Sequence, residues 1–208
     1  MVDPLSVAES YTALAETYAA DRDGDGLERT VVESVVDGLP PESRVLDAGC
    51  GDGVPGLAAA VEHGTAYGVD ISAGQLALAS ERVPSAGLAR GDLRSLPITT
   101  DAVDCVVALH SLIHVPLEDH QTVIDEFARV LRPGGTLVCT EGHTEWVGEN
   151  PDWLDTGVEM AWEIAGTETT IEQLESAGFS VEETWASEDE LADEEGASKP
   201  IFRARLPE

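Results

Sequence analysis

An aspartate and three closely spaced glycines form the most chemically specific segment of this 208-residue chain, Asp47-x-Gly49-x-Gly51-x-Gly53. Glycines let the backbone approach a bound ligand, and a helix that begins after them offers free N–H groups. A second acid, Asp70, follows Gly49 by 21 residues at the end of the next apolar run. A carboxylate at such a place accepts hydrogen bonds from ribose hydroxyls in nucleotide-binding α/β folds. The pattern predicts a pocket for a nucleoside.

The glycine spacing differs from the dinucleotide-binding fingerprint G-x-G-x-x-G. That fingerprint would need a glycine at position 54, where the chain has Val54. A nicotinamide oxidoreductase is therefore disfavoured. Two structural alternatives stay open: the glycines form an ordinary strand-to-helix turn, and Asp70 or Ser72 caps the next helix.

Alternating strands and helices are predicted to position these residues. Apolar runs predict strands over residues 45–47, 66–70, 88–90, 103–109 and 136–140, with helices over 55–62, 73–82 and 117–131 between them. A helix over 169–177 and two strands over 179–185 and 200–206 follow. Apolar strands that alternate with helices indicate a mostly parallel sheet covered on both faces. The expected fold class is α/β, a Rossmann-like, seven-stranded, mostly parallel sheet with helices on both faces and an antiparallel C-terminal hairpin.

Several of these segments together resemble a known family. Residues 45–53, 101–114 and 126–137, the last with an Arg-Pro-Gly-Gly turn, are similar to class I S-adenosylmethionine (SAM) dependent methyltransferases of the type 11, ubiquinone-biosynthesis-like group. The resemblance covers residues 10–140. It implies SAM as cofactor and methyl transfer as activity. One departure is Val54-Pro55, where the family often has a small residue and a glycine.

The resemblance also implies roles for single residues. Asp47 would orient the amino group of SAM, Asp70 would bind the ribose, and Asp92 would bond the adenine amino group. Ile71 and Leu93 would form apolar walls for adenine. A turn role for Asp92 and a core role for the two apolar residues are the alternatives. The predicted cofactor-binding set is Asp47, Gly49, Cys50, Gly51, Gly53, Asp70, Ile71, Asp92, Leu93, Leu109 and Tyr18.

Three histidines are candidates for a base or positioning group: His114, His110 and His143, in that order of preference. A hydroxyl, amine or acidic carbon acceptor must lose a proton during methyl transfer. His110 and His114 are four residues apart, which on a helix suits a metal, but no third ligand accompanies them. We therefore predict no metal site. Each of the three histidines could instead be structural.

The chain is predicted to form one domain, residues 1–208. Residues 1–40, with helices over 6–20 and 27–37, would form a lid over the cofactor pocket. Residues 142–168 contain Trp146, Trp153 and Trp162, which would wall the site of an apolar or aromatic acceptor. Core packing explains the tryptophans almost as well. Asp21–Gly26 imitates half of a calcium loop, but Val32 stands where the bidentate glutamate belongs, so an acidic turn is expected.

Composition restricts the partners and the environment. The chain has 41 acids and 11 bases, a net charge of −30, and Lys199 as its single lysine. Acid spread along the whole chain favours a protein of a high-salt cytoplasm. Without a basic stripe, nucleic acid is not an expected partner.

No apolar run is long enough to span a membrane, and no signal peptide is recognised. The cysteines are expected to be buried and unpaired, and a monomer and a homodimer both stay open.

These observations lead to one functional prediction and one alternative. The prediction is SAM-dependent methyl transfer to a small-molecule acceptor by in-line displacement, in which the protein holds the two reactants dry and aligned. The alternative is a protein that binds SAM or its product S-adenosylhomocysteine (SAH) without catalysis.

Overall fold

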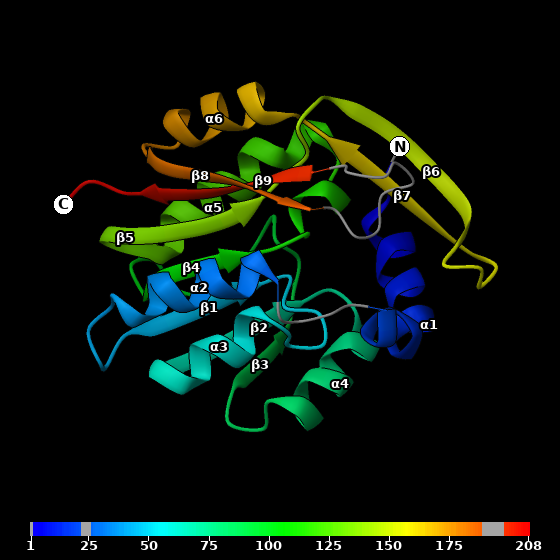
Figure 1. Cartoon of the computed structure of the whole chain (residues 1–208), viewed down its shortest axis with the longest axis horizontal. Helices are drawn as coiled ribbons and strands as arrows, with labels where there is room; N and C mark the ends of the chain where they lie inside the picture. Colours follow the sequence, from blue (N-terminus) through cyan, green and yellow to red (C-terminus); the bar gives the residue numbers. More distant parts are fainter. Residues whose placement is uncertain (1, 22–25, 189–197) are drawn as a thin grey trace.

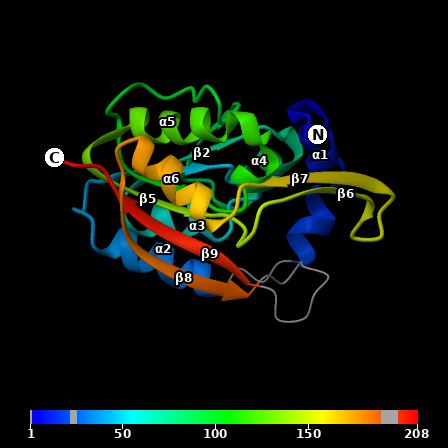
Figure 2. The same ribbon diagram turned by 90° about the horizontal axis from the view of Figure 1, so that it is seen from above.

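A seven-stranded sheet runs through the molecule with helices on both of its faces (Figures 1 and 2). The computed structural model describes residues 2–21, 26–188 and 198–208. The strand order is β3-β2-β1-β4-β5-β9-β8, and β9 is the antiparallel member. The predicted fold class, including the antiparallel C-terminal hairpin, is confirmed. The sheet strands are β1 (Arg44–Ala48), β2 (Thr65–Asp70), β3 (Gly87–Arg90), β4 (Val103–Ala108), β5 (Leu131–Thr140), β8 (Ser180–Glu188) and β9 (Ser198–Arg205).

Helices cover the sheet and connect its parallel strands. They are α1 (Pro4–Asp21), α2 (Leu27–Asp37), α3 (Gly56–His63), α4 (Ala73–Arg82), α5 (His120–Val130) and α6 (Thr167–Ser176), with short 3-10 turns η1 (Leu112–His114) and η2 (Leu117–Asp119). Phe127 of α5 is fully buried on one face of the sheet, and Leu57 of α3 is fully buried on the other. Burial on both faces explains why the central strands are almost wholly apolar.

The sheet order reverses between β1 and β4, and this reversal places the site. β2 and β3 lie on one side of β1, whereas β4 and β5 lie on the other. The connections that leave the carboxyl ends of β1 and β4 therefore diverge, and a crevice opens between them. Asp47 pairs with Gly68 of β2 and with Val107 of β4, so it stands at this point.

Residues 142–168 contain a second, two-stranded sheet that the sequence did not indicate. Its strands, β6 (Trp146–Trp153) and β7 (Val158–Ile164), form an antiparallel hairpin. The hairpin lies beside α1 (Figure 2). Leu14 and Tyr18 of α1 pack there against Trp153 and Met160. In contrast, α2 packs against α3, so of the two helices in the predicted lid, α1 is the one that covers the carboxyl edge of the sheet.

Glu163 ties three segments together next to this edge. Its Oε1 accepts the N–H of Val2 at 2.6 Å, and its Oε2 accepts the N–H of Leu117 at 2.9 Å. The side chain is buried, and it links β7 to the N-terminal segment and to η2. The contacts hold α1 and the hairpin in place above the sheet.

Glu141 anchors the other end of the hairpin. It follows β5, is 2% exposed, and its Oε1 accepts the N–H of Ala165 at 2.8 Å. Burial raises the pKa of Glu141 to about 8, against the opposing effect of N–H bonds from Ala165 and Gly142. Since the ordinary value is 4.5, the carboxyl is protonated in the folded protein at neutral pH.

Replacing Glu141 by glutamine should stabilise the protein increasingly as the pH rises from 4.5 to about 8. A folded-state pKa raised above the unfolded one contributes stability that is present below pH 4.5 and is lost as the pH rises through about 8. Glutamine keeps the acceptor for Ala165 and never ionises. We expect the Tm of Glu141→Gln to exceed that of the wild type by about 5 °C at pH 8.5 and by almost nothing at pH 5. The exposed Glu172→Gln is the matched control, and an equal difference at both pH values would contradict the assignment.

The start of β5 differs from the prediction, and most of the predicted acidic turn lies outside the residues that the structure describes. β5 begins at Leu131, so the Pro133-Gly-Gly segment belongs to an irregular start of the strand and not to a loop before it. The pairing register with β4 shifts there because proline lacks an N–H for the ladder. Of the predicted acidic turn at Asp21–Gly26, residues 22–25 lie outside the described residues.

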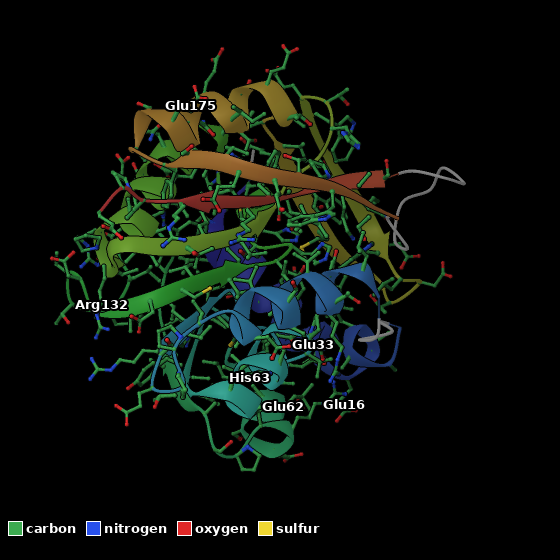
Figure 3. All side chains as sticks on the ribbon, turned by 60° about the vertical axis from the view of Figure 1, so that its left-hand side comes forward. Glu16, Glu33, Glu62, His63, Arg132 and Glu175 are labelled. Atoms are coloured by element: carbon green, nitrogen blue, oxygen red, sulfur yellow. The ribbon has the colours of Figure 1, made fainter. Side chains whose placement is uncertain are left out.

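Acidic side chains are spread over the surface (Figure 3). Glu16, Glu62 and Glu175, labelled in that view, are exposed on three different helices. Many of the arginines are engaged by carboxylates, as Arg132 is by Asp104 at 2.8 Å. Within the described ranges, no helix has both the length and the apolar character that a bilayer crossing requires.

Candidate functional site

A pocket opens at the carboxyl edge of the sheet, at the reversal point between β1 and β4. It has a volume of about 920 Å³ including its mouth. Its walls come from α1, the loops after β1, β2, β3 and β4, and the first turn of α4. The described lining residues are Pro4, Val7, Tyr11, Tyr18, Asp47, Gly49, Cys50, Gly51, Asp52, Val54, Pro55, Gly56, Asp70, Ile71, Gln75, Gly91, Asp92, Leu93, Arg94, Leu109, His110, Ser111, His114 and Val115.

The glycine loop forms the floor of the pocket. Gly49 and Gly51 have φ angles of +82° and +52°, a backbone conformation that favours glycine. A Cβ on Gly49 would collide with Ser111, so the loop also needs glycine to pass the segment after β4. Gly53 does not line the pocket, which corrects the prediction for this residue. A Cβ there would meet Val83 at 3.0 Å, so Gly53 serves the close packing of α3 and α4.

Asp47 lies at the base of the pocket and is 4% exposed. Burial raises its pKa to about 7, and the nearby carboxylate of Asp70 adds to the effect. A Cβ on Gly56 would stand 2.5 Å from Asp47 Oδ2. Only a glycine leaves room for the carboxylate at this position. This glycine, Gly56, follows Val54-Pro55 and is the first residue of α3. Such a buried carboxylate suits a cationic group of a ligand.

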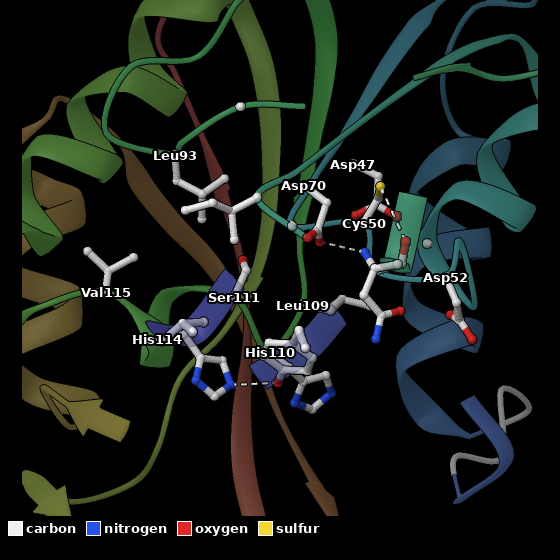
Figure 4. Close-up of a pocket in the computed structure, with 18 of the residues that line it drawn as sticks. Asp47, Cys50, Asp52, Asp70, Leu93, Leu109, His110, Ser111, His114 and Val115 are labelled. Carbon is white, nitrogen blue, oxygen red and sulfur yellow. Dashed lines mark hydrogen bonds between the residues drawn. The ribbon is translucent and has the colours of Figure 1, made fainter. Parts of the chain in front are cut away.

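Asp70 holds two parts of the pocket with its two oxygens. Oδ2 accepts the N–H of Gly51 at 2.8 Å (Figure 4). Oδ1 accepts the N–H of Ser72, also at 2.8 Å. Burial raises the pKa of Asp70 above its ordinary value, and these N–H bonds oppose the rise. A carboxylate has several lone-pair sites, so beside the N–H groups of Gly51, Ser72 and Ile71 it keeps acceptor capacity for a ligand hydroxyl. Ser72 is the cap of α4, because its Oγ accepts the N–H of Gln75 at 3.2 Å.

His114 lies opposite the glycine loop and is 8% exposed. Its Nδ1 is 3.1 Å from the carbonyl oxygen of Ala161, and its Nε2 is 2.7 Å from the hydroxyl of Tyr11. A carbonyl only accepts, so Nδ1 carries the proton, and Nε2 accepts the hydrogen of Tyr11. Burial lowers the pKa of His114 to about 4, although the Ala161 bond opposes this. The imidazole is therefore neutral at physiological pH.

His110 lines the same pocket but is bonded differently. Its Nε2 lies 2.8 Å from the carboxylate of Glu28, and Lys199 Nζ lies 3.2 Å from the same carboxylate. Its backbone N–H donates to Thr140 Oγ1 at 2.7 Å, with φ at +53°. The single lysine of the chain thus belongs to a buried charge cluster at the pocket wall.

His143 is not among the described residues that line the pocket. Its Nε2 is 3.1 Å from Ser198 Oγ, and its Nδ1 is 3.4 Å from Thr167 Oγ1. The prediction that His143 faces the same pocket as the other two histidines is wrong. The segment between β5 and β6 instead places the side chain beside the first residues of β9 and α6.

Comparison with known proteins identifies the family. A family profile described as a methyltransferase domain matches residues 46–139. The methyltransferase GfsG of Streptomyces halstedii is 34% identical over 171 residues, which are 79% of this chain and 60% of that protein. An uncharacterised methyltransferase of Synechocystis is 32% identical over 151 residues, 69% of each chain. The chain belongs to the SAM-dependent methyltransferase family. The family cofactor is SAM.

The chain also shares its fold with solved members of the family. The structure of magnesium protoporphyrin IX methyltransferase from Synechocystis with bound SAM aligns at a TM-score of 0.70 and 20% identity. The alignment covers 99% of this chain and 98% of that one. At this identity the likeness shows the fold alone. The chain spans about 60% of the length of GfsG, so its own activity is a matter of proposal.

Asp92 has an internal partner that the sequence did not indicate. Arg94 binds it in a fork, with Nη2–Oδ2 at 2.7 Å, and extends to Asp119 at 2.9 Å. Burial would raise the pKa of Asp92, but the hydrogen bonds from Arg94 outweigh it and hold the pKa below its ordinary value. Asp92 lines the pocket as predicted, and its bond to adenine stays a prediction.

The tryptophans of residues 142–168 stand behind the pocket wall. Trp153 contacts the rings of Tyr11 and Tyr18 at centroid distances of 5.9 and 5.5 Å, and Trp162 lies 6.0 Å from His114. Within the described part of the chain, no residue of 142–168 lines the pocket itself. The hairpin fixes the aromatic side chains that do, and its predicted part in an acceptor site stays a prediction.

Sequence reasoning missed several lining residues. Tyr11 belongs to the predicted lid helix, where its spacing to Tyr18 resembles the family pattern, but it was not predicted as a pocket residue. Ser111 lies in the loop after the predicted fourth strand, and no spacing rule singled it out. Gln75 follows its cap Ser72 by three residues, which reads as an ordinary helix position. Only the packing of α1 over α4 shows that these residues share a pocket.

Proposed function

We propose that the protein transfers the methyl group of SAM to a small-molecule acceptor by in-line displacement. The observation that carries the proposal is the buried polar cradle of Asp47, Asp70 and the glycine loop at the end of β1 and β2. It supplies a carboxylate for the ammonium group of SAM, a carboxylate for its ribose, and backbone for close approach. When bound, SAM supplies an activated methyl group on a sulfonium.

The Tyr11–His114 pair is the proposed route for the acceptor proton. The Tyr11 hydroxyl gives its hydrogen to Nε2 of the neutral imidazole, while its oxygen has lone pairs to accept from an acceptor hydroxyl. As the oxygen of the acceptor attacks the methyl carbon, the carbon–sulfur bond breaks, and the proton passes through Tyr11 to His114. Positive charge moves from sulfur to imidazole, so the net charge of the buried site stays constant.

The acceptor is proposed to be a small molecule with an apolar or aromatic body. The wall opposite the glycine loop consists of Val7, Tyr11, Val115 and neighbouring apolar side chains under α1. Trp153 and Trp162 support this wall from behind. The solved relative of similar fold acts, by its name, on magnesium protoporphyrin IX, also a small molecule with a large aromatic body.

Calorimetric titration of the protein with SAM and SAH, with NAD as control, tests the proposal. Binding of SAM and SAH but not NAD is expected, and turnover is then sought with a panel of phenols and hydroxylated aromatic acids. Failure of the folded protein to bind SAM would refute the proposed function. Tight binding without turnover across the panel would favour the alternative, a SAM-binding protein without catalysis.

Binding of SAH should strengthen as the pH rises through 7. In the free protein the pKa of Asp47 is raised to about 7 by burial, and the ammonium group of SAH selects the ionised carboxylate. Binding then releases a proton below that pH, so Kd at pH 6 should be about tenfold higher than at pH 8. Titrations in two buffers of different ionisation enthalpy measure the proton release. Asp47→Asn should bind more weakly with no such pH dependence. A proton uptake at pH 6 would contradict the role of Asp47.

We also propose that the protein works in a high-salt cytoplasm. Its 41 acids face 11 bases, and surface carboxylates repel one another unless salt screens them. Between 0.1 and 2 M KCl, Tm should therefore rise by about 10 °C or more. Thermal unfolding followed by circular dichroism checks this. A Tm that stays constant or falls over this range would oppose the proposal.

A further inference from the structure

Two side chains that line the pocket hold buried polar atoms without a hydrogen-bond partner in the described part of the chain. Ser111 leaves its Oγ unpaired, and Gln75 leaves both Oε1 and Nε2 unpaired. Buried polar groups are nearly always paired in native proteins, so each exception needs a reason. Gln75 is the larger exception, because a whole carboxamide has no partner. At the wall of a binding pocket, such a group is available to a ligand.

The local structure directs Gln75 toward the cofactor site. It lies in the first turn of α4, where its N–H donates to the cap Ser72. Helical side chains lean toward the N-terminus of their helix, which here is the end that faces the pocket. α1 covers this turn, since Gly74 lies directly against Thr12 and Thr12 Oγ1 is 2.9 Å from Ser72 Oγ. Gln75 is consequently only 1% exposed.

The neighbours of the carboxamide belong to the ribose corner of the pocket. Gln75 Oε1 lies 3.7 Å from the place of a Cβ on Gly51. The N–H of Gly51 donates to Asp70, and the other oxygen of Asp70 accepts from Ser72. Gln75 therefore stands beside the carboxylate that receives the ribose. A hydroxyl both donates and accepts, and a carboxamide offers one group for each, whereas a carboxylate only accepts.

We propose that Gln75 is a second residue that recognises the ribose diol of the cofactor, with Nε2 donating to a hydroxyl oxygen and Oε1 accepting a hydroxyl hydrogen. This inference rests on the proposed function, since Asp70 assigns the ribose corner. In this role Gln75 would help the protein to bind a ribose ligand more tightly than the corresponding deoxyribose ligand. The ligand-free protein keeps the carboxamide unpaired, and the cofactor pairs it.

Titration of the full chain with SAH, 2′-deoxy-SAH and 3′-deoxy-SAH tests the proposal on wild type and Gln75→Met, a variant of similar volume. We expect the Kd of SAH to rise about tenfold in Gln75→Met. The Tm of the ligand-free variant should not fall, because no hydrogen bond is lost in that state. Gln173→Met, which removes another amide with an unpaired buried Oε1 outside the pocket, should bind SAH as the wild type does. Gln75→Glu, which loses the donor and adds a charge beside Asp70, should bind more weakly still.

The two deoxy analogues decide whether the ribose is the partner. The analogue that lacks the hydroxyl contacted by Gln75 should bind the wild type more weakly than SAH does. For Gln75→Met the difference between this analogue and SAH should be clearly smaller, because the variant has already lost the same hydrogen bond. The inference is overturned if Gln75→Met binds SAH within twofold of wild type, or if the substitution weakens SAH and both analogues equally. Wild type that binds no SAH would refute the proposed function itself, so the two failures are distinguishable.

Discussion

Asp70→Asn should weaken SAH binding by at least about 100-fold. In the proposed function the carboxylate accepts a hydrogen bond from each hydroxyl of the ribose diol, and charge-assisted hydrogen bonds contribute about 1.5–3 kcal/mol each. Two such bonds correspond to about a 100-fold change in Kd or more. Asparagine would also point an NH2 group at the N–H of Gly51 or Ser72, and two donors facing each other loosen the glycine loop. Calorimetry in 2 M KCl measures the loss.

A matched variant separates the site from the general loss of a carboxylate. Asp125→Asn removes the same charge on α5, where Asp125 contacts Gln121 outside the pocket. Its SAH affinity should equal that of the wild type. Thermal unfolding of both variants reports whether each still folds. Folded Asp70→Asn with an affinity within fivefold of the wild type would exclude Asp70 as the ribose ligand.

Tyr11→Phe and His114→Asn should each lower kcat by about 10²–10⁴-fold once an acceptor is known, because each interrupts the proposed proton route. Both residues act in one pathway, so the double variant should lose little more than the more damaging single one. SAH affinity should change by less than about threefold, since neither residue is assigned to the cofactor. In His114→Asn, the amide can still donate to Ala161 and preserve the local structure.

The pH profile adds a second readout for His114. Burial lowers its pKa to about 4, so the imidazole stays able to accept a proton well below the usual histidine range. At saturating SAM, kcat should be level between pH 6 and 8 and fall only as the pH approaches about 4. Tyr67→Phe and His63→Asn, at places outside the pocket, are the controls. A profile that falls at pH 6.5 would exclude the buried imidazole as the proton acceptor, as would full activity in Tyr11→Phe.

Much of the pocket floor was predictable because it depends on local chemistry. Gly49 and Gly51 need positive φ, and Asp47 and Asp70 end apolar strands, so short spacings carry the signal. Parallel strands then bring their carboxyl ends to one edge of the sheet. Gly53 shows the limit of such reasoning: its spacing fits the motif, but its surroundings are Val83 and Ala79 in place of a ligand.

The acceptor side was less predictable because it depends on contacts between distant segments. Tyr11 and His114 are 103 residues apart, and no pattern in either segment reports their hydrogen bond. The hairpin of β6 and β7 has little alternation of apolar and polar residues, since much of it is exposed and only a few side chains, such as Trp153 and Met160, face α1. Its strands were therefore missed, and His143 was assigned to the wrong side.

The sequence by itself determined the α/β fold, the family and the residues at the floor of the pocket, because strand periodicity and glycine conformation are properties of adjacent residues. Only the tertiary structure decided which groups meet across the pocket. It placed Gln75 beside Gly51, paired His114 with Tyr11 and His110 with Glu28, and bonded Glu141 to Ala165. The contacts of Gln75, His114 and Glu141 depend on how α1 and the hairpin pack onto the sheet, and the His110–Glu28 pair depends on how α2 packs. Desolvation by this packing shifts the pKa values of His114 and Glu141.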